Sequence, residues 1–364
     1  MNFLALRRNI WDNIGRDNFV YEPRVELNRQ DPLNHYSEIE FLRNFRLTKD
    51  SANELANFLE DELVFRTERS RPMTPLQQLC VTLAFLANGS FIHVAGELMG
   101  VKKSCAFYNI HNTVRVLCGK IDAFITLPTA NEMRNTATEL FNRFKIPNVV
   151  LGVDGSFIRL ENKPRVSEIA EGQDPQDFWC RKQFYAINSQ VVGDDKGLIR
   201  NIVAKWAGKT HDSRVWRNSS IKTWFESQTA FTLVGDSAYP ISPTLIKPYF
   251  RPDDPRRRKF NKHLSGMRTI MTENVIGRWK GRFRCLRMGI RTKVPFACDI
   301  IAASACLHNF ATLRNNPMPD DANDEENDDD EEISPESPLH YHDDVRAARA
   351  AGKAYRESVL NNYF

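Results

Sequence analysis

The chain carries two kinds of hydrophobic pattern, and the change falls near residue 146. Up to about residue 125, apolar residues recur every three or four positions, the spacing of amphipathic helices. SEIEFLRNF, SANELANFLEDEL and PLQQLCVTLAFLAN follow this pattern, and Thr48 and Ser51 offer an N-cap. From about residue 146, short apolar runs are bounded by Gly, Asp and Pro, which is typical of strands. The pattern predicts a helical part followed by an α/β part.

The helical part divides into an N-terminal region, residues 1–72, and a segment of short helices, residues 73–125. In the second segment, the turn GVKKS joins two helices, and Ser104 is the expected N-cap of the second. Two helices joined by a tight turn are typical of a helix-turn-helix, but an ordinary helical bundle has the same pattern. The candidate DNA contacts of this pair are Lys102, Lys103, Asn109 and His111.

Four strand-like runs follow, namely NVVLGVDGSFIRL, FYAINSQVVGDD, LIRNIVAKWAG and AFTLVGDSAYP. GDDKG predicts a hairpin between the second and third runs. SRVWRNSSIKTWFES, capped by Asp212 or Ser213, predicts a helix before the fourth. Three consecutive strands, a helical crossover and a further strand predict a mixed α/β sheet flanked by helices. Beyond it we expect a basic loop, PDDPRRRKFNKH, a long helix from about 266 to 287 and an apolar helix near 297–314.

Composition indicates a soluble intracellular protein without a membrane segment. The 364 residues are 41% apolar, enough for substantial cores. The N-terminus lacks the pattern of a secretory signal, and the apolar stretch Phe296 to Leu307 is too short to span a bilayer. Seven cysteines, an odd number with no CxxC pair, favour reduced thiols of the cytosol or nucleus over disulfides or a zinc site.

The formal charge of +4 hides a strong asymmetry. Residues 320–332 contain ten acids and no base, and residues 251–293 contain fourteen Lys or Arg against three acids. So long a basic stretch favours a phosphate-rich partner, nucleic acid first, although a solvated face is the alternative. We expect residues 315–345 to be an acidic disordered tail, which binds a basic partner, screens the basic surface or simply aids solubility. Residues 346–364 predict a detached C-terminal helix.

Three acids stand out as candidates for chemistry. Asp154 is expected to end the first strand and Asp236 the fourth, so neighbouring strands would bring both to one sheet edge. Glu273 lies in the expected long helix and is the only acid between Asp254 and Asp299. On that helix, Gly277, Lys280 and Arg284 share its stripe, beside an apolar stripe of Ile276, Trp279 and Phe283.

Three carboxylates brought together repel one another unless they are protonated or share a cation. Such hard oxygen ligands suit Mg²⁺ or Mn²⁺, and two ions can clamp the attacking and leaving oxygens of a phosphodiester. Each acid also has a structural interpretation: Asp154 and Asp236 as turn residues, and Glu273 as an ion-pair partner of Arg278. Their joint occurrence favours metal-assisted cleavage.

At these residues the chain resembles the DDE domain of the PIF/Harbinger transposases and of the nucleases derived from them. The landmarks, in order, are GVDGSFIRL, RKQFYAINSQVV, IVAKWAGKTHDSR, GDSAYP, ENVIGRWKGRFRCL and LHNF. The resemblance covers about residues 146–314. It implies an RNase H-like fold, a catalytic and metal-binding triad of Asp154, Asp236 and Glu273, and Mg²⁺ or Mn²⁺ as the cofactor, with two ions expected.

The resemblance carries further expectations. It supports the helix-turn-helix, and it implies a Myb/SANT-like partner protein and a nuclear location, alongside a possible cytoplasmic one. WAG stands where the family has Pro-Gly, which leaves the geometry of that loop open. Asp212 recurs in the family pattern, and we interpret it as a helix cap first and as an accessory acid second. RRRK at 256–259 suits nuclear import or a DNA backbone equally.

We predict DNA contacts at two groups of residues, one in the helix pair and one beyond Glu273: Lys102, Lys103, Asn109, Arg278, Lys280, Arg282 and Arg284. The favoured function is a divalent-metal-dependent nuclease that hydrolyses phosphodiesters or transfers strands. The alternative is a catalytically silent DNA-binding or chromatin factor that retains the transposase fold. A small phosphoester hydrolase is a third class, but it would not need the extended basic surface.

Overall fold

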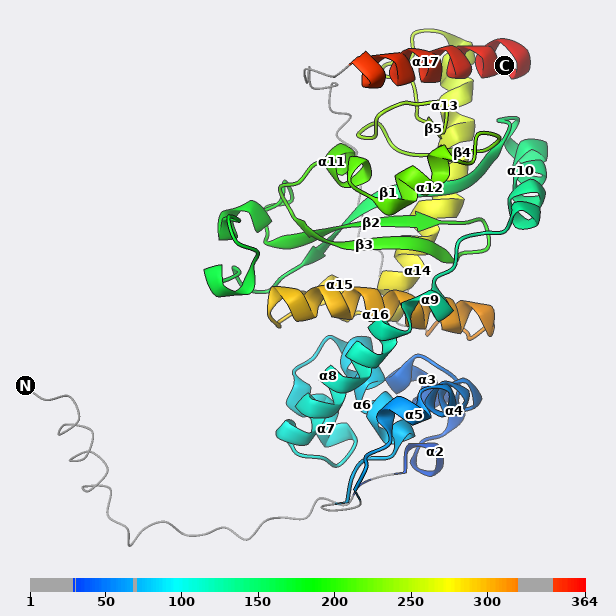
Figure 1. Ribbon diagram of the computed structural model, residues 1–364. Helices are drawn as coiled ribbons and strands as arrows, with labels where there is room; N and C mark the ends of the chain where they lie inside the picture. Colours follow the sequence, from blue (N-terminus) through cyan, green and yellow to red (C-terminus); the bar gives the residue numbers. More distant parts are fainter. Residues whose placement is uncertain (1–28, 30, 68–70, 320–342) are drawn as a thin grey trace, which may run out of the picture.

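A computed structural model of the chain describes residue 29 and residues 31–67, 71–319 and 343–364 (Figure 1). Most of the predicted acidic tail lies outside the described residues, as does the N-terminal segment assessed for a secretory signal. In Figure 1 the N-terminal helices form one layer, the long helix α16 (Val294–Leu313) forms the next, and the sheet lies beyond it.

The first part of the described chain is helical, as predicted for residues up to about 125, whereas the helix over residues 130–144 was not predicted. Its helices are α2 (Pro32–His35), α3 (Glu38–Phe45), α4 (Lys49–Phe58), α5 (Glu60–Leu63), α6 (Pro75–Asn88), α7 (Ile92–Leu98), α8 (Lys103–Gly119), α9 (Ile121–Phe124) and α10 (Ala130–Phe144). Capping fixes several starts: Ser37 and Thr74 form capping boxes, and Thr48 accepts the Ser51 amide as predicted. Ser104 is not a cap, because α8 begins at Lys103 with Lys102 as N-cap, two residues earlier than expected.

Helices α7 and α8 meet in a close crossing. Gly100, between them, has φ +62°, a left-handed conformation that glycine adopts freely. A Cβ on Gly96 would lie 2.8 Å from the carbonyl oxygen of Val101 and 3.1 Å from Cβ of Ala106. The glycine at position 96 therefore lets the turn fold back tightly, and α8 also packs on α6.

The sheet has five strands: β1 (Val149–Arg159), β2 (Ala186–Gly193), β3 (Ile199–Ala207), β4 (Thr232–Val234) and β5 (Leu245–Ile246). Their order is β3-β2-β1-β4-β5. The first three strands form an antiparallel meander, and β4 runs parallel to β1 and β5. The predicted meander, hairpin and crossover are confirmed, and the mixed α/β sheet is consistent with an RNase H-like fold. Strand β5 was not predicted, because two residues leave no pattern.

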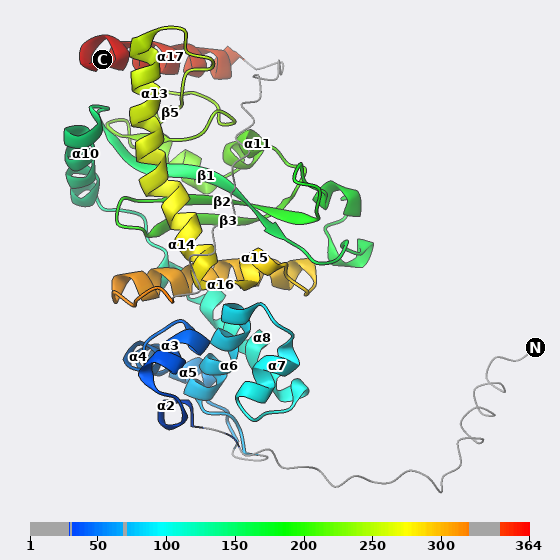
Figure 2. The ribbon, with the colours of Figure 1, turned by 180° about the vertical axis from the view of Figure 1, so that it is seen from behind.

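Helices cover both faces of the sheet. Helices α11 (Asp212–Arg217) and α12 (Ser220–Glu226) lie on one face in Figure 1. The view from behind shows a long helix crossing the other face (Figure 2). That helix consists of α13 (Pro255–Arg268), a π-helical turn (Thr269–Glu273) and α14 (Asn274–Arg282), and α15 (Cys285–Met288) follows.

The long helix differs from its prediction at both ends. It begins at Pro255, where Asp254 caps it and proline occupies the first turn, so the expected basic loop is helical. It ends at Arg282 rather than near 287. Sequence periodicity could not show the early start, because residues 255–262 are mostly charged.

Helix α16 is the central core helix. By length and composition it could cross a membrane, but most of its apolar window is buried inside the protein, where it packs on α8 and β3. It is longer than the stretch we judged too short to span a bilayer. Its Asn309 is buried. The side-chain oxygen of Asn309 accepts a hydrogen bond from the Ile199 N–H in β3, and its side-chain nitrogen donates one to the Ile199 carbonyl oxygen.

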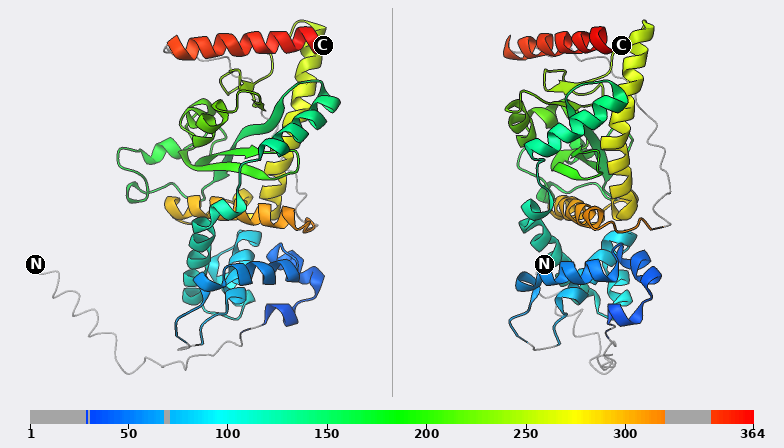
Figure 3. Two further views of the ribbon diagram at one scale, coloured as in Figure 1. Left: turned by 45° about the vertical axis from the view of Figure 1, so that its right-hand side comes forward. Right: turned by 90° about the vertical axis from the view of Figure 1, so that its right-hand side faces the viewer.

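The C-terminal helix α17 (Asp343–Tyr363) lies at the far end from the N-terminal helices (Figure 3). It packs against α13 and β5. The ring of Phe364 contacts those of Phe260 and His263 edge-on. The expectation that this helix is detached is therefore wrong, because its apolar face had a partner in α13 that the sequence did not reveal.

Candidate active site

The parallel pairing of β1 and β4 brings Asp154 and Asp236 together. The last residue pair of these strands is Gly152 with Val234, and each aspartate follows two residues later. Parallel strands advance in step, so the two carboxylates come to the same place beyond β4. The predicted proximity of these two acids follows from this register.

Asp154 does not end its strand, as we expected it to. Strand β1 continues to Arg159, and Asp154 is paired with Val191 of β2. The strand leaves β4 at Gly152 and then pairs with β2 alone. The apolar run ends at Asp154 because one neighbouring strand ends there, and not because β1 does.

Glu273 is the last residue of the π-helical turn, in which the Asn274 amide donates to the carbonyl oxygen of Thr269. In such a turn, residues five apart lie nearly above one another, whereas in an α-helix they do not. Arg268 and Glu273 are brought onto one face in this way. The sequence analysis assumed α-helical spacing and did not predict this pairing.

A pair of glycines lets the π-helical turn lie directly on the sheet. Gly152 of β1 faces Gly193 of β2. A Cβ on Gly152 would lie 2.7 Å from Cγ2 of Thr272, and one on Gly193 only 2.2 Å from the carbonyl oxygen of Met271. No larger residue fits at either position unless the turn moves away from the sheet.

Arg268 connects two of the candidate acids. Its Nη2 lies 3.4 Å from Oδ2 of Asp154 and 3.9 Å from Oε1 of Glu273. The arginine side chain is only 7% exposed. The other carboxylate oxygen of Glu273 accepts a 2.7 Å hydrogen bond from the Thr269 hydroxyl. This role was not predictable from the sequence, because Arg268 is one of fourteen cations in its stretch.

The surroundings of Asp154 oppose its ionisation. Burial, followed by the negative charges of Asp236 and Asp212, raises its pKa to about 7, although Arg268 and the Gly155 amide act in the other direction. The Gly155 N–H donates to Oδ1 of Asp154 at 2.8 Å. A carboxyl group of this kind readily exchanges its proton for a cation.

Asp212 is a fourth acid of the site. It is the first residue of α11, its side chain makes no capping bond, and His211 is the N-cap, so our interpretation as a helix cap is wrong. Oδ1 of Asp212 accepts a 2.8 Å hydrogen bond from the Asn188 amide. A Cβ on Gly155 would lie 2.6 Å from that oxygen, so Asp212 lies against β1 beside Asp154. Burial raises the pKa of Asp212.

Tyr239 completes the polar lining. It is 1% exposed, and its hydroxyl is buried with no hydrogen-bond partner among the described residues. Burial and the charges of Asp212, Asp154 and Asp236 all raise its pKa, so the hydroxyl stays protonated beside these acids. No role for Tyr239 was expected from the sequence.

The structure separates the predicted DNA contacts into exposed and buried residues. Lys102, Lys103 and Arg278 are exposed, and Arg284 is half-buried. Asn109 is 2% exposed and donates its side-chain amide to the carbonyl oxygen of Cys105. It faces the helical core and not solvent, so its prediction as a DNA contact is wrong.

Lys280 and Arg282 are also buried and do not form the expected cationic surface. Lys280 is 8% exposed and donates to the carbonyl oxygen of Phe157 at 3.4 Å. Arg282 is fully buried, and its guanidinium donates to the carbonyl oxygens of Arg46, Asn316 and Pro317. The cationic stripe predicted from Glu273 to Arg284 is therefore wrong, because Lys280 packs against β1 and the helix ends at Arg282, before Arg284.

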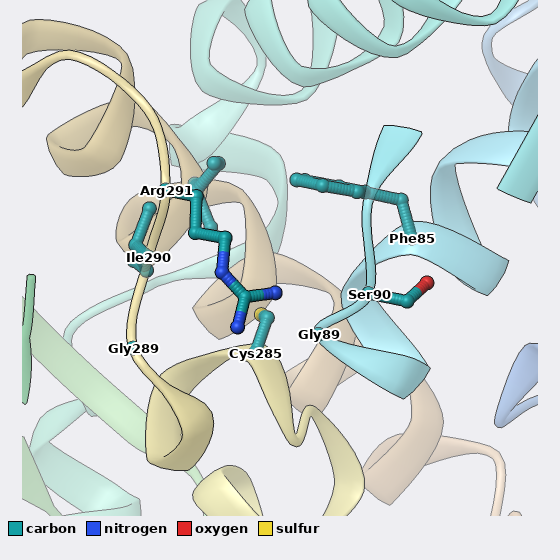
Figure 4. A pocket seen from close by; sticks show the side chains of 8 residues that line it. Phe85, Gly89, Ser90, Cys285, Gly289, Ile290 and Arg291 are labelled. Carbon is teal, nitrogen blue, oxygen red and sulfur yellow. The ribbon is translucent and has the colours of Figure 1, made fainter. Parts of the chain in front are cut away.

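A small pocket lies elsewhere, between the end of α6 and the loop after α15 (Figure 4). Phe85, Ser90 and Arg291 are among its lining residues. None of the four acids lines it. Asp154 and Asp236 lie instead where β4 ends beside β1.

The acids provide donors of the kind that Mg²⁺ and Mn²⁺ prefer, namely carboxylate oxygens. Among the described residues, however, no three acidic, histidine or cysteine side chains are grouped closely enough to hold an ion. The Arg268 guanidinium lies between Asp154 and Glu273. The positive charge among the acids is therefore that of Arg268. The carboxylate oxygens are nevertheless donors of the chemical type that a divalent ion prefers.

Comparison with known proteins agrees with this arrangement. Residues 153–309 match the family model described as DDE superfamily endonuclease. Relatives named "Putative nuclease HARBI1" from Rattus norvegicus and Homo sapiens are each 24% identical over 263 residues, which cover 71% of this chain and 73% of the relative. "Protein ALP1-like" of Arabidopsis thaliana is 22% identical over 276 residues, 70% of this chain and 65% of that protein.

No solved structure matches the chain. The matched residues 153–309 include Asp154, Asp212, Asp236 and Glu273. The sequence resemblance to the Harbinger-derived nucleases is confirmed by these matches. The chain therefore resembles the DDE superfamily endonucleases over residues 153–309 and the relatives named "Putative nuclease HARBI1" over 71% of its length.

Proposed function

We propose that this protein is a divalent-metal-dependent DNA nuclease in which Asp154, Asp236 and Glu273 hold the metal. The observation that carries the proposal is the convergence of Asp154 and Glu273 on the buried cation of Arg268, with Asp236 close enough to Asp154 to oppose its ionisation. Carboxylates whose surroundings raise the pKa, as for Asp154 and Asp212, are typical of functional sites. A structural ion pair would not need several acids beside one arginine.

When bound, Mg²⁺ or Mn²⁺ would supply Lewis acidity for in-line cleavage of a phosphodiester, by hydrolysis or strand transfer. The chain's own residues prepare the site. The Gly155 amide orients Asp154, Thr269 orients Glu273, and Asn188 orients Asp212. The protonated Tyr239 hydroxyl is available as a hydrogen-bond donor beside the acids.

DNA would be held by cations outside the acid cluster. Lys102 and Lys103 at the start of α8 are exposed next to the exposed rings of Phe107 and Tyr108. The tight crossing of α7 and α8 supports a helix-turn-helix in which α8 enters the major groove. Arg278 and Arg284 would contact phosphates nearer the acids. A Myb/SANT-like partner and a nuclear location belong to the proposal through the family resemblance alone.

A plasmid-cleavage assay tests the function. We expect the full chain to nick supercoiled DNA with Mg²⁺ or Mn²⁺ and to be inactive in EDTA. Asp236→Ala and Glu273→Ala should lower the rate by at least a hundredfold, because each removes a metal ligand. The matched control is Glu139→Ala, which removes an exposed acid of α10.

Cleavage that survives both substitutions would contradict the assignment of the acids. Metal-independent DNA binding without cleavage, in a correctly folded chain, would instead support the silent DNA-binding alternative. All the predicted acids are retained, and this favours the enzyme. A small phosphoester hydrolase would show DNA binding with little salt dependence, if it bound DNA at all.

A further inference from the structure

The strongest unexplained feature near the acids is the position of Arg268. One guanidinium nitrogen lies within 4 Å of carboxylate oxygens from two separate elements, Asp154 of β1 and Glu273 of the π-helical turn. The side chain is buried. Neither the family match nor the names of the relatives assign a role to this residue.

The backbone is built to hold Arg268 in this position. The π-helical turn places it on the same face as Glu273. Its carbonyl oxygen accepts a 2.8 Å hydrogen bond from the buried Thr272 hydroxyl, and the facing glycines Gly152 and Gly193 allow the turn to approach the sheet. The arginine is thus aimed at the acids by several independent features.

The charge of Arg268 reduces the repulsion among the carboxylates, as a bound divalent ion would also do. Arginine stays protonated in proteins, so a permanent positive charge offsets the repulsion among Asp154, Asp236 and Asp212. A metal ion bound by Asp154 and Glu273 would compete with Arg268 for these carboxylates, because the guanidinium already lies against Oδ2 of Asp154 and near Oε1 of Glu273. Two cations that share these oxygens would repel each other strongly.

We propose that Arg268 is a positioning residue that is exchanged for the metal: it holds Asp154 and Glu273 in place in the unloaded site and releases both when a divalent ion binds. The inference rests on the proposed metal site. It adds that Arg268 and the metal ion compete for Asp154 and Glu273. Arg268 therefore weakens the affinity for the metal and stabilises the metal-free protein.

Calorimetric titration of the full chain with Mn²⁺ tests the exchange. Arg268→Met removes the competing charge with similar side-chain length, and we expect it to bind Mn²⁺ at least tenfold more tightly than the wild type. Its melting temperature in EDTA should fall, and the stabilisation by saturating Mn²⁺ should grow. Arg268→Lys, whose compact charge reaches fewer oxygens, should have an intermediate affinity.

Lys262→Met is the matched control, because it removes the same charge from an exposed position of α13. Its Mn²⁺ affinity should equal that of the wild type within twofold, so a general charge effect is excluded. If Arg268→Met fails to fold, the order of Arg268→Lys and wild type still decides the question.

Equal or weaker Mn²⁺ binding by folded Arg268 variants would overturn the exchange while leaving the metal site intact. Failure of every protein, wild type included, to bind millimolar Mn²⁺ would contradict the metal site itself and the inference with it. The two failures are therefore distinguishable in one set of titrations.

Discussion

Burial and the charges of Asp236 and Asp212 oppose the ionisation of Asp154, while Arg268 and the Gly155 amide favour it. The outcome is a carboxyl group whose pKa is raised to about 7. At this value the group is poised between a protonated form and a form that binds a cation. The site is consequently expected to respond to pH in the range in which nucleases work.

Metal affinity should therefore depend on pH. A carboxyl group must lose its proton before it binds a metal, so below pH 7 the apparent dissociation constant for Mn²⁺ should rise by about tenfold per pH unit. Above about pH 8 it should level off. Calorimetric titration between pH 5.5 and 8.5 measures this profile, and an affinity that is constant from pH 6 to 8 would contradict the raised pKa.

The stability of the metal-free protein should show the opposite trend. An acid with a raised folded-state pKa stabilises the fold below its unfolded pKa, and this contribution is lost as the pH rises through about 7. For Asp154 the loss is about 2–4 kcal/mol. Urea unfolding of wild type and Asp154→Asn, at pH 4 to 8 in EDTA, should show a smaller fall for the variant.

Single residues of the site were predictable only in part. Asp154, Asp236 and Glu273 could be identified because acids follow apolar runs or stand alone in a basic stretch. Asp212 was interpreted mainly as a cap, because its position before a helix is typical of one. Arg268 and Tyr239 carried no local signal, since their roles depend on contacts across β1 and the π-helical turn.

At the scale of elements, the π-helical turn is the part that assembles the site. It carries Glu273 at its end and follows directly on Arg268. Its contact with the sheet depends on the glycine pair Gly152 and Gly193. Insertions of this kind in helices are frequent at functional sites.

Gly193→Ala should disturb this contact. The added Cβ would lie 2.2 Å from the carbonyl oxygen of Met271, so the turn must shift. We expect a loss of about 1–3 kcal/mol in the free energy of unfolding and a marked loss of Mn²⁺ affinity. Urea unfolding and calorimetric titration provide the two measurements.

Gly277→Ala is the matched control in α14, where an added Cβ meets nothing within 4 Å. It should raise stability by about 0.5–1 kcal/mol, because alanine favours a helix over glycine. Metal binding should be unchanged. If Gly193→Ala behaved like this control, the π-helical turn would not depend on the glycine contact.

The elements themselves were largely predictable, and the exceptions have physical causes. Alternation and turn residues indicated β1 to β4 and the hairpin of β2 and β3. The start of α13 at Pro255 was missed because its first turns are charged rather than amphipathic. The packing of α17 and the burial of Arg282 depend on distant partners, which local periodicity does not report.

On the scale of the whole molecule, the N-terminal helices, α16 and the sheet share one hydrophobic core. Buried Arg282 links them further, because it donates to carbonyl oxygens of Arg46, Asn316 and Pro317. The exposed start of α8 is thus held in a fixed relation to the acids. We expect DNA that contacts α8 to reach the acids without a hinge motion.

Binding of DNA should therefore be strongly salt-dependent and should need α8. Lys102→Ala and Lys103→Ala should each weaken binding of a DNA duplex and lower the slope of log affinity against log salt by about 0.9. Lys49→Ala, whose lysine pairs with Glu38, is the control. Fluorescence anisotropy between 50 and 200 mM salt measures the slopes, and unchanged slopes for both variants would remove α8 from the DNA interface.

The proposed function requires that the acids brought together by β1, β4 and the π-helical turn hold a divalent metal for DNA cleavage. Metal rescue of Asp236→Cys tests this requirement, because a thiolate is a softer ligand that accepts Mn²⁺ better than Mg²⁺. We predict that the variant is inactive with Mg²⁺ and recovers measurable plasmid cleavage with Mn²⁺, while the wild type cleaves with both. Equal cleavage by Asp236→Cys with the two metals at the wild-type rate would contradict the claim.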